Sequence, residues 1–270
     1  MANAKDHVEK VDIMKDEFGW EIPVELVPLP SKGLIYSPES ALYRKESIKI
    51  KAMTAREEDI LSSQALIKEG TVINHLVNSC VLESGIRAED MVLGDRTALM
   101  IAIRITGYGT EYDIKAQCRN CDHNNEIKID LASIPIKRLK VEPAEEGKNL
   151  FSFKLPVTKK LVTFKFLNSH DEREKTQRSK TMKKHLSGLV GDSITSSLEY
   201  AIQSIDGIKD RNKIKHFIMN MPAYDSKAIR KFMRENEPGM DMKHSFSCVN
   251  CNHENEIVMP ITTEFFWPST

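Results

Sequence analysis

The chain carries one ten-residue motif twice, 130 residues apart. Cys118-Arg-Asn-Cys-Asp-His-Asn-Asn-Glu-Ile127 aligns with Cys248-Val-Asn-Cys-Asn-His-Glu-Asn-Glu-Ile257. The same offset continues upstream without a gap, so that Asp95 aligns with Asp225. A register kept over this length is typical of an internal duplication rather than of chance similarity. We therefore expect two copies of one structural unit, which constrains the fold more than any other feature of the sequence.

Further upstream the two copies still match, with shifted spacing. Residues 48–58 resemble residues 162–172, and each stretch is a short alternating run that leads into a helix start. Alternation with a period of two predicts a half-buried strand. Strands are also expected after each Cys-x-x-Cys turn, over 126–129 and 256–259. Each unit is thus predicted to contain a strand, helices, a second strand, a cysteine knuckle and a last strand.

Two pairs of polar residues mark the expected starts of the helices. Thr54 and Glu57 fit a capping box, in which the N-cap hydroxyl satisfies a free helix N–H and the carboxylate reaches back to the N-cap. Asn168 and Asp171 form a weaker version of the same start. The sequence therefore predicts that a helix begins at the corresponding point of both units.

Asp95 and Asp225 each precede a run of apolar residues with helical spacing. We interpret both as helix N-caps rather than catalytic carboxylates, because Asp is strongly favoured at that position. Gly109 in the first unit and Gly239 in the second are expected to end these helices and turn the chain into the strand that leads to each cysteine pair.

Four of the five cysteines lie in the two knuckles. A Cys-x-x-Cys turn between strands points both sulfurs at one spot, and two facing turns supply the four thiolates of a tetrahedral zinc site. The expected ligands of one structural Zn per chain are Cys118, Cys121, Cys248 and Cys251. Two other arrangements stay open: a separate metal in each half, with His123 or His253 as a further ligand, or no metal at all.

A closed site of four thiolates argues for structure and against metal-assisted hydrolysis, because it leaves no coordination position for water. A thioredoxin-like redox role needs a βαβ context and a helix N-terminus, and neither is apparent. We expect His123 and His253 to be turn residues, or to contact the cysteine ligands without binding the metal, and Cys80 to be an inert core thiol.

These features predict an α+β fold in which internally duplicated strand–helices–strand units are joined by a zinc-ribbon-like four-Cys site. The expected segments are an extended Pro-rich N-terminal arm (1–44), a first repeat with its knuckle (45–135), a linker (136–149), a second repeat with its knuckle (150–262) and an aromatic C-terminal tail (263–270).

Charge and hydropathy exclude several classes of protein. Lys+Arg and Asp+Glu are equal at 39 each, which argues against a polycation that coats nucleic acid. The basic stretch 173–185 is an alternative nucleic-acid surface, but a solvated helix face explains it better. The N-terminal residues have no apolar stretch of a secretory signal, and no apolar run approaches the ~20 residues of a membrane span. We expect a soluble protein of the cytoplasm.

Catalytic motifs are missing from the sequence. It has no Gly-x-Ser-x-Gly elbow, no phosphate-binding Gly-Lys-Ser/Thr loop and no His-Glu-x-x-His pair. Acidic residues such as Glu57 and Glu58 complement a helix dipole and need no catalytic role. We expect no enzymatic activity and assign no catalytic residue.

Aromatic and proline residues outside the repeats are the candidates for partner binding. They lie in the N-terminal arm and in the tail, and comprise Pro30, Tyr36, Phe265, Phe266 and Trp267. An aromatic cluster at a chain end either completes a strand or anchors in a partner's pocket. Under the second interpretation, deletion of residues 263–270 is expected to leave the fold and the zinc content intact while weakening the capture of a partner.

Four stretches together resemble the baseplate hub assembly protein family of contractile-tailed phages of the T-even type. They are Leu29-Pro-Ser-Lys-Gly-Leu-Ile-Tyr36, Met53-Thr-Ala-Arg-Glu-Glu-Asp-Ile-Leu61, residues 93–112 with their Leu-Gly-Asp-Arg start, and the knuckle 118–127. The resemblance covers about 29–130. In the second half Arg56 is replaced by His170, so any surface that it forms is not duplicated.

The resemblance implies a non-enzymatic phage protein, made in the host bacterial cytoplasm, that helps to build the central hub of the tail baseplate. Its implied partners are other baseplate and hub proteins. The resemblance leaves open whether the protein departs as an assembly chaperone or stays in the virion as a subunit. A zinc-ribbon nucleic-acid-binding protein is the alternative from a different class.

Overall fold

The computed structural model describes residues 9–15, 17, 19, 21–185, 194–261 and 263–266, and the strands and helices within them confirm the α+β class. The strands are β1 (Glu9–Lys15), β2 (Glu21–Pro28), β3 (Ser47–Lys51), β4 (Glu111–Gln117), β5 (Asn124–Asp130), β6 (Ile136–Lys137), β7 (Phe151–Lys154), β8 (Leu161–Phe164), β9 (Ile202–Ile205), β10 (Gly239–Met240), β11 (Lys243–Ser247) and β12 (Glu254–Val258). The helices are α1 (Ala55–Ser62), α2 (Gln64–Glu69), α3 (Val72–Cys80), α4 (Leu93–Tyr108), α5 (Ser169–His185), α6 (Ile194–Ala201), α7 (Arg211–Asn220) and α8 (Ala223–Asn236). Short 3-10 turns are η2 (Ala88–Asp90), η3 (Leu131–Ser133) and η4 (Thr263–Phe266).

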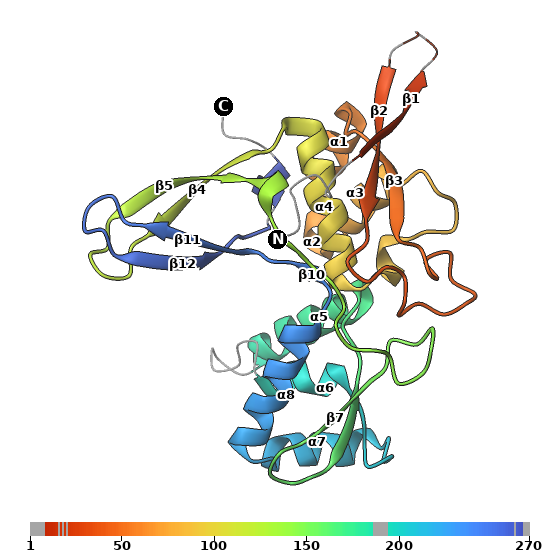
Figure 1. Ribbon diagram of the computed structural model, residues 1–270, viewed down its shortest axis with the longest axis vertical. Helices are drawn as coiled ribbons and strands as arrows, with labels where there is room; N and C mark the ends of the chain where they lie inside the picture. Colours follow the sequence, from red (N-terminus) through yellow and green to blue (C-terminus); the bar gives the residue numbers. More distant parts are fainter. Residues whose placement is uncertain are drawn as a thin grey trace.

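Two bodies and one projecting arm make up the molecule (Figure 1). The upper body combines the antiparallel sheet β1-β2-β3 with α1 to α4, and the lower body combines the antiparallel sheet β7-β8-β9 with α5 to α8. The arm consists of the hairpins β4-β5 and β11-β12, which lie side by side and point away from both bodies. Each body thus supplies one hairpin of the arm.

Helix α4 is the centre of the upper body. Its residues 98–104 are all buried, because the sheet lies against one side and α3 against another. Its start also touches the second half: a Cβ on Gly94 would lie 1.8 Å from the carbonyl oxygen of Pro238. Only glycine permits this approach of two backbones, so the start of α4 and the chain before β10 are in direct contact.

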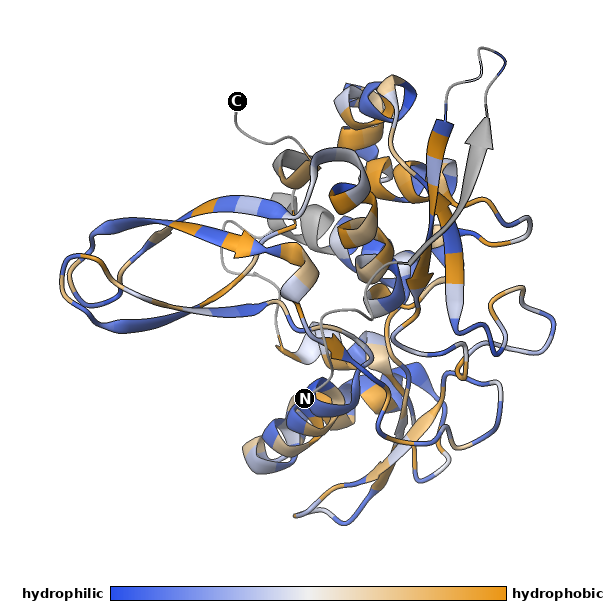
Figure 2. Cartoon of the chain, turned by 45° about the horizontal axis from the view of Figure 1, so that its top comes forward, coloured by the Kyte–Doolittle hydropathy of each residue, from blue (hydrophilic) through white to orange (hydrophobic). Residues whose placement is uncertain are grey.

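The lower body has its own small core. It joins helices α6 to α8 to the sheet through Leu155, Val162, Ile202 and Ile229, and all four are 0% exposed. Above them, stacked phenylalanines from β7, β8 and α8 continue into the larger core of the upper body. Figure 2 shows hydrophobic residues gathered on the inner sides of these elements. None of the helices in the described ranges combines the length and hydropathy that a bilayer-crossing segment needs.

Within the segment 1–44, predicted as an extended N-terminal arm, the residues from Glu21 onward belong to the upper body. Strand β2 is the middle strand of the upper sheet, and Val24 and Val27 are each 2% exposed. The prolines do not prevent pairing, because β1 and β3 pair with its two edges in antiparallel orientation, with Pro23 opposite Ile13 and Pro28 opposite Ser47. Residues 136–149 are likewise no free linker, since β6 pairs with β10.

The predicted capping box at the start of α1 is confirmed. Thr54 is the N-cap, and both its N–H and its hydroxyl donate to the Glu57 carboxylate, at 2.9 and 2.6 Å. Glu57 is buried and also accepts from Lys51 Nζ at 2.7 Å and from the Ser79 hydroxyl. The box therefore fixes a helix start and ties it to the strand before it and to α3.

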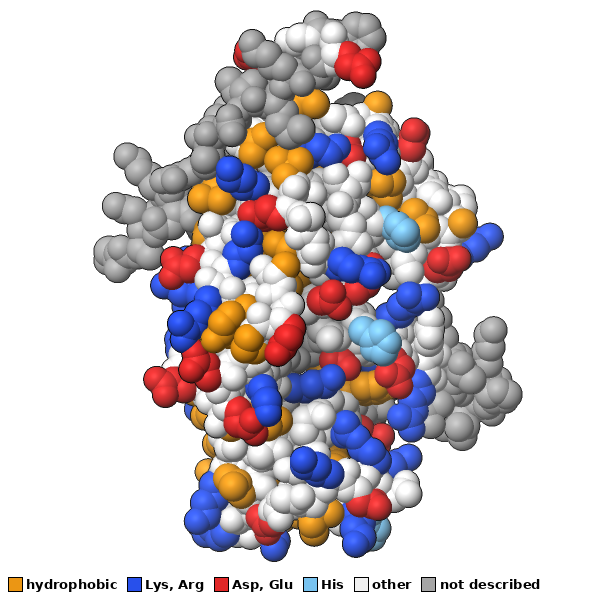
Figure 3. Space-filling model, turned by 90° about the vertical axis from the view of Figure 1, so that its right-hand side faces the viewer, with side chains coloured by type: hydrophobic (Ala, Val, Ile, Leu, Met, Phe, Trp, Pro, Cys, Tyr) orange, Lys and Arg blue, Asp and Glu red, His pale blue; other side chains and the backbone are white. Residues whose placement is uncertain are grey.

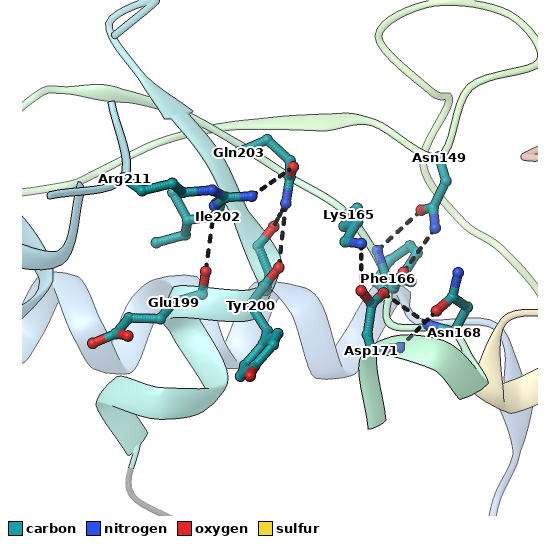
Figure 4. A network of polar contacts seen from close by, with 11 residues as sticks. Asn149, Lys165, Phe166, Asn168, Asp171, Glu199, Tyr200, Ile202, Gln203 and Arg211 are labelled. Carbon is teal, nitrogen blue, oxygen red and sulfur yellow. Dashed lines mark hydrogen bonds and ion pairs between the residues drawn. The ribbon is translucent and has the colours of Figure 1, made fainter. Parts of the chain in front are cut away.

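The weaker box at the start of α5 is built in the same way (Figure 4). Asn168 Oδ1 accepts from the Asp171 N–H at 2.9 Å, and the Asp171 carboxylate accepts from the Asn168 N–H at 3.2 Å. Lys165 Nζ lies 2.7 Å from Asp171 Oδ1, as Lys51 does from Glu57. The sequence correspondence of the two starts extends to their side-chain contacts.

Asp95 and Asp225 are not N-caps, which corrects the interpretation from sequence. The N-caps are Val92 for α4 and Pro222 for α8, so each aspartate is the third residue of its helix. Both carboxylates are fully buried and accept hydrogen bonds from distant segments rather than from their own helix. Helix-capping patterns do not reveal this role, because the partner residues lie 59 or more positions away in the chain.

Candidate metal centre

The cysteines sit in two turns of the same construction at the tip of the arm. In the β4-β5 turn the Cys118 N–H donates to the His123 carbonyl at 2.9 Å, and Asp122 has a left-handed φ of 57°. In the β11-β12 turn the Cys248 N–H donates to the His253 carbonyl at 3.0 Å, with Asn252 at a φ of 56°. Asp and Asn tolerate this conformation better than other residues with a side chain.

The two turns bring the four sulfurs of Cys118, Cys121, Cys248 and Cys251 within 4.8 Å of one another. The Cys118 and Cys251 sulfurs are 3.7 Å apart, and so are those of Cys121 and Cys248. A tetrahedron with Zn–S distances of about 2.3 Å has edges of about 3.8 Å. A disulfide would need about 2.05 Å. The donor set and its spacing therefore fit one tetrahedral thiolate-bound metal.

The acidities of the thiols differ within the cluster. Burial would raise the pKa of Cys118, but hydrogen bonds from the Asn120 N–H and the Asn255 amide lower this pKa to about 6. The pKa of Cys121 is lowered by the His123 backbone, yet the neighbouring sulfurs of Cys251 and Cys248 raise it to about 11. Four adjacent thiolates repel one another, so a cation is needed to hold all four in the ionised form.

Among the described residues the cluster is complete in itself. Four protein sulfurs satisfy a tetrahedral ion and leave no position for water or substrate. Cys118 and Cys248 are fully buried, and Cys121 and Cys251 are half-buried. The arrangement is that of a structural centre that joins the β4-β5 hairpin to the β11-β12 hairpin.

The two histidines contribute through their backbones only. Their carbonyls accept from Cys118 and Cys248, while both side chains are exposed and belong to no metal-binding group in the described chain. The side chains around the sulfurs come instead from asparagines that sequence reasoning missed, at positions 120, 125, 250 and 255. The sequence could have indicated these asparagines, because Asn120 and Asn250, like Asn125 and Asn255, are repeated at the offset of 130 residues.

The candidates for partner binding that lie within the described residues are inside the protein. Tyr36 is 7% exposed, and its hydroxyl donates to Asp95 Oδ2 at 2.6 Å, while Pro30 is also buried. Phe265 and Phe266 are 0% exposed, which corrects the view that they reach out to a partner. Trp267 lies outside the described residues. A ring that already fills the chain's own core has no surface left for another protein.

Phe265 and Phe266 instead pack into the core of the upper body. Phe265 packs edge-on against Tyr112 at a centroid distance of 4.9 Å. Its carbonyl accepts from Arg104 Nε at 2.9 Å, and the same guanidinium donates to the carbonyls of Gly109 and Glu111. Arg104 is 1% exposed, so these neutral acceptors keep a buried cation hydrogen-bonded. The C-terminal residues of the second half thereby complete the core of the first.

The stretches 29–36 and 93–96 meet in space. The Ser31 N–H and hydroxyl donate to the two Asp95 oxygens, beside the Tyr36 hydroxyl. Burial raises the pKa of Asp95, although these hydrogen bonds and the Arg138 charge counteract the rise. Arg96 donates to the Ser169 hydroxyl at 3.1 Å and to Glu172 at 2.7 Å. Arg96 therefore links α4 of the upper body to the start of α5 in the lower body, whereas Ser31, Tyr36 and Asp95 contact one another within the upper body.

A cavity of about 370 Å³ lies in the lower body beside the network in Figure 4. Its charged lining residues are of both signs: Lys165, Asp171, Glu174, Arg178, Glu199, Arg211 and Lys215. Lys165 pairs with Asp171, and Arg211 donates to the Ile202 carbonyl at 2.7 Å. Basic and acidic side chains are likewise interspersed on the face shown in Figure 3. The lining contains no cysteine, histidine or serine as a nucleophile or base.

The fold and the cluster together define a two-bodied α+β protein whose halves meet in a four-cysteine arm. The chain belongs to the family of T4 bacteriophage base plate proteins, whose profile matches residues 29–267. A search of curated proteins and a search of solved structures each return no match. Membership supports a structural or assembly role in the phage baseplate, together with other baseplate proteins, and confirms the baseplate part of the resemblance.

Proposed function

We propose that this protein is a non-enzymatic component or assembly factor of the central hub of the tail baseplate. Family membership supports the baseplate, and the stretches 29–36 and 93–112 carry the resemblance to hub assembly proteins. The observation that carries a structural rather than a catalytic role is the closed group of four sulfurs.

The proposal includes one shared zinc-ribbon-like Zn site per chain, held by all four knuckle cysteines. The ion supplies four bonds between two hairpins whose strands come from different halves of the chain. The apolar layer between the hairpins is thin, since few side chains such as Ile127, Ile129 and Phe246 are buried there. Small structures with little core depend on such a ligand for stability.

Internal duplication is part of the proposal, and matched contacts support it. In each half a third-position aspartate binds an upstream turn: Asp95 accepts from the Ser31 N–H, and Asp225 accepts from the Val157 and Thr158 N–H groups. The capping boxes, their lysine partners and the cysteine turns also correspond. We infer two related units at about 45–135 and 150–262, with residues 21–44 added to the first.

Metal content and X-ray absorption of the purified protein test the site. One zinc with four sulfur neighbours, lost in both Cys118→Ser and Cys248→Ser, is expected if the halves share the ion. Cys80→Ala is the matched control, because Cys80 is a buried cysteine of α3 outside the cluster. Zinc retained in one knuckle variant would contradict a shared site. Absorption at the iron edge with four sulfur neighbours would show that the bound metal is iron and not zinc.

Phage complementation tests the hub role. A phage that lacks this gene is expected to make tails without an assembled hub, and the wild-type gene supplied in trans should restore them. Mass spectrometry of purified particles then separates a subunit that stays from a factor that departs. Normal hubs in its absence would overturn the proposal.

One observation, the distribution of charge along the chain, favours the alternative of a nucleic-acid-binding protein. Residues 150–262 contain 19 Lys+Arg against 13 Asp+Glu, so the neutral total hides a basic second half. Binding to DNA through phosphates would fall steeply with salt. Titration against duplex and single-stranded DNA at two salt concentrations is expected to show no tight complex, and a strongly salt-dependent one would favour the alternative.

A further inference from the structure

Every sulfur of the cluster has an asparagine donor from the opposite hairpin. The Asn255 Nδ2 donates to Cys118 Sγ at 3.5 Å, and the Asn125 side chain donates to Cys248. The remaining two donors follow the same rule at 3.6 Å each, from Asn120 to Cys251 and from Asn250 to Cys121. The β4-β5 hairpin thus donates to the sulfurs of β11-β12, and the β11-β12 hairpin donates to those of β4-β5.

The inner pair, Asn125 and Asn255, has a second contact across the gap. Asn255 Oδ1 accepts from the Arg119 N–H at 3.0 Å, and Asn125 Oδ1 accepts from the Val249 N–H at 2.9 Å. Both amides also donate to the carbonyl of the histidine in their own turn. With exposed fractions of 2% and 5%, these side chains have no alternative partner in water. They fix the register of one turn against the other.

The side chains of the outer pair, Asn120 and Asn250, make no such hydrogen bond to the backbone of the opposite turn among the described residues. Both residues are exposed at the tip, and their side-chain amides contact only a sulfur of the opposite hairpin among the described residues. An exposed asparagine loses little by turning to solvent, so its place over a sulfur is explained by the hydrogen bond to that sulfur.

We propose that the four asparagines form an outer hydrogen-bonding shell that tunes and positions the thiolates for a divalent, thiophilic metal. The inference rests on the proposed metal site. Four thiolates around a dication carry a net charge of −2, and one amide donor per sulfur disperses this charge in a water-poor setting. Because each donor comes from the opposite hairpin, the shell is complete only when the hairpins are docked. Metal binding and docking of the two hairpins are therefore thermodynamically coupled.

The outer pair allows a test that leaves the fold alone. In Asn120→Ala combined with Asn250→Ala, metal affinity measured by chelator competition is expected to fall about 10- to 100-fold. The cobalt-substituted protein should show its sulfur-to-metal charge-transfer band at lower energy, because sulfurs that lose a hydrogen bond give up electrons more readily. Asn124→Ala is the matched control, an exposed asparagine of β5 one residue away from the shell.

The inner pair tests positioning. Asn125→Ala and Asn255→Ala should each weaken metal binding more than the outer variants, and should also raise amide exchange in both hairpins rather than only in the mutated one. Asn125→Ser and Asn255→Ser, which keep a short hydrogen-bonding side chain, are expected to recover part of the affinity.

The outcomes separate the two proposals. A wild-type protein that binds neither zinc nor cobalt would overturn the metal site itself. A wild-type protein that binds metal, with the band and affinity of the outer variant unchanged from those of Asn124→Ala, would overturn the asparagine shell while leaving the metal site standing.

Discussion

At the scale of single residues, the buried aspartates carry the most information about how the chain is held together. Asp95 and Asp225 occupy the third position of α4 and α8, where a carboxylate complements the helix dipole. Their hydrogen bonds, however, go to loops that connect two strands of the sheet in their own body, β2 to β3 for Asp95 and β7 to β8 for Asp225. Each aspartate thereby fixes a strand-connecting loop to the central helix of its body.

Asp95→Ala is expected to lower the free energy of unfolding by about 2–4 kcal/mol. The substitution leaves the Ser31 and Tyr36 donors buried without their acceptor. Urea denaturation measures the change. Asp113→Ala, at an exposed site on β4, serves as control and should stay within about 0.5 kcal/mol of wild type. Equal stability of the two variants would contradict the role of Asp95.

Glu57 predicts a specific pH dependence of stability. Burial would raise its pKa, but hydrogen bonds from Lys51, Ser79 and Thr54 lower it from 4.5 to about 2. A lowered pKa in the folded state stabilises the protein above pH 4.5, and this contribution disappears as the pH falls toward 2. When the pH is lowered from 4.5 to 2, the free energy of unfolding of the wild type should fall by about 3 kcal/mol more than that of Glu57→Gln, as measured by urea denaturation. The same pH dependence of stability in the wild type and in Glu57→Gln would contradict this role of Glu57.

At the scale of elements, the tail shows how tertiary contact changes the meaning of a pattern. Three aromatic residues at a chain end look like an anchor for a partner, yet η4 returns Phe265 and Phe266 to the core beside α4. The alternation in the arm was easier to predict, since a burial pattern with period two along β5 follows directly from its sequence. Local periodicity therefore located the strands but not the destination of the tail.

Phe265→Ala or Phe266→Ala is expected to destabilise the protein by about 3–5 kcal/mol, because each leaves a cavity in a closed core. Deletion of residues 263–270 should likewise reduce stability, contrary to the expectation from sequence. Thermal and urea unfolding measure both. Met219→Ala is a suitable control, since Met219 is 61% exposed. A stable deletion variant that failed only in partner capture would restore the anchor interpretation.

At the scale of the whole molecule, the two bodies and the arm differ in what stabilises them. The two apolar cores of the bodies share Phe153 and Met233, and the backbones of Gly94 and Pro238 are in direct contact. The arm relies on the cysteine cluster and a thin apolar layer. Removing a metal ion should therefore affect the arm far more than the bodies.

Chelation at neutral pH is expected to raise amide exchange in β4, β5, β11 and β12 while the strands of the two sheets keep their protection. Hydrogen exchange with mass spectrometry, before and after removal of metal, measures this. Readdition of zinc should restore protection as a reversibility control. Loss of protection throughout both bodies would show instead that the ion stabilises the whole fold.

The sequence by itself determined the α+β class, the capping boxes, the strands of the arm and the four clustered cysteines, because each follows from spacing within a short window or from a repeated motif. Only the tertiary structure decided which carboxylate, tail or asparagine meets which partner. Asn255 reaches Cys118 across 137 positions, and Arg104 reaches Phe265 across 161. Such pairs depend on how two bodies dock, and docking is set by the packing of whole surfaces rather than by the pattern along the chain.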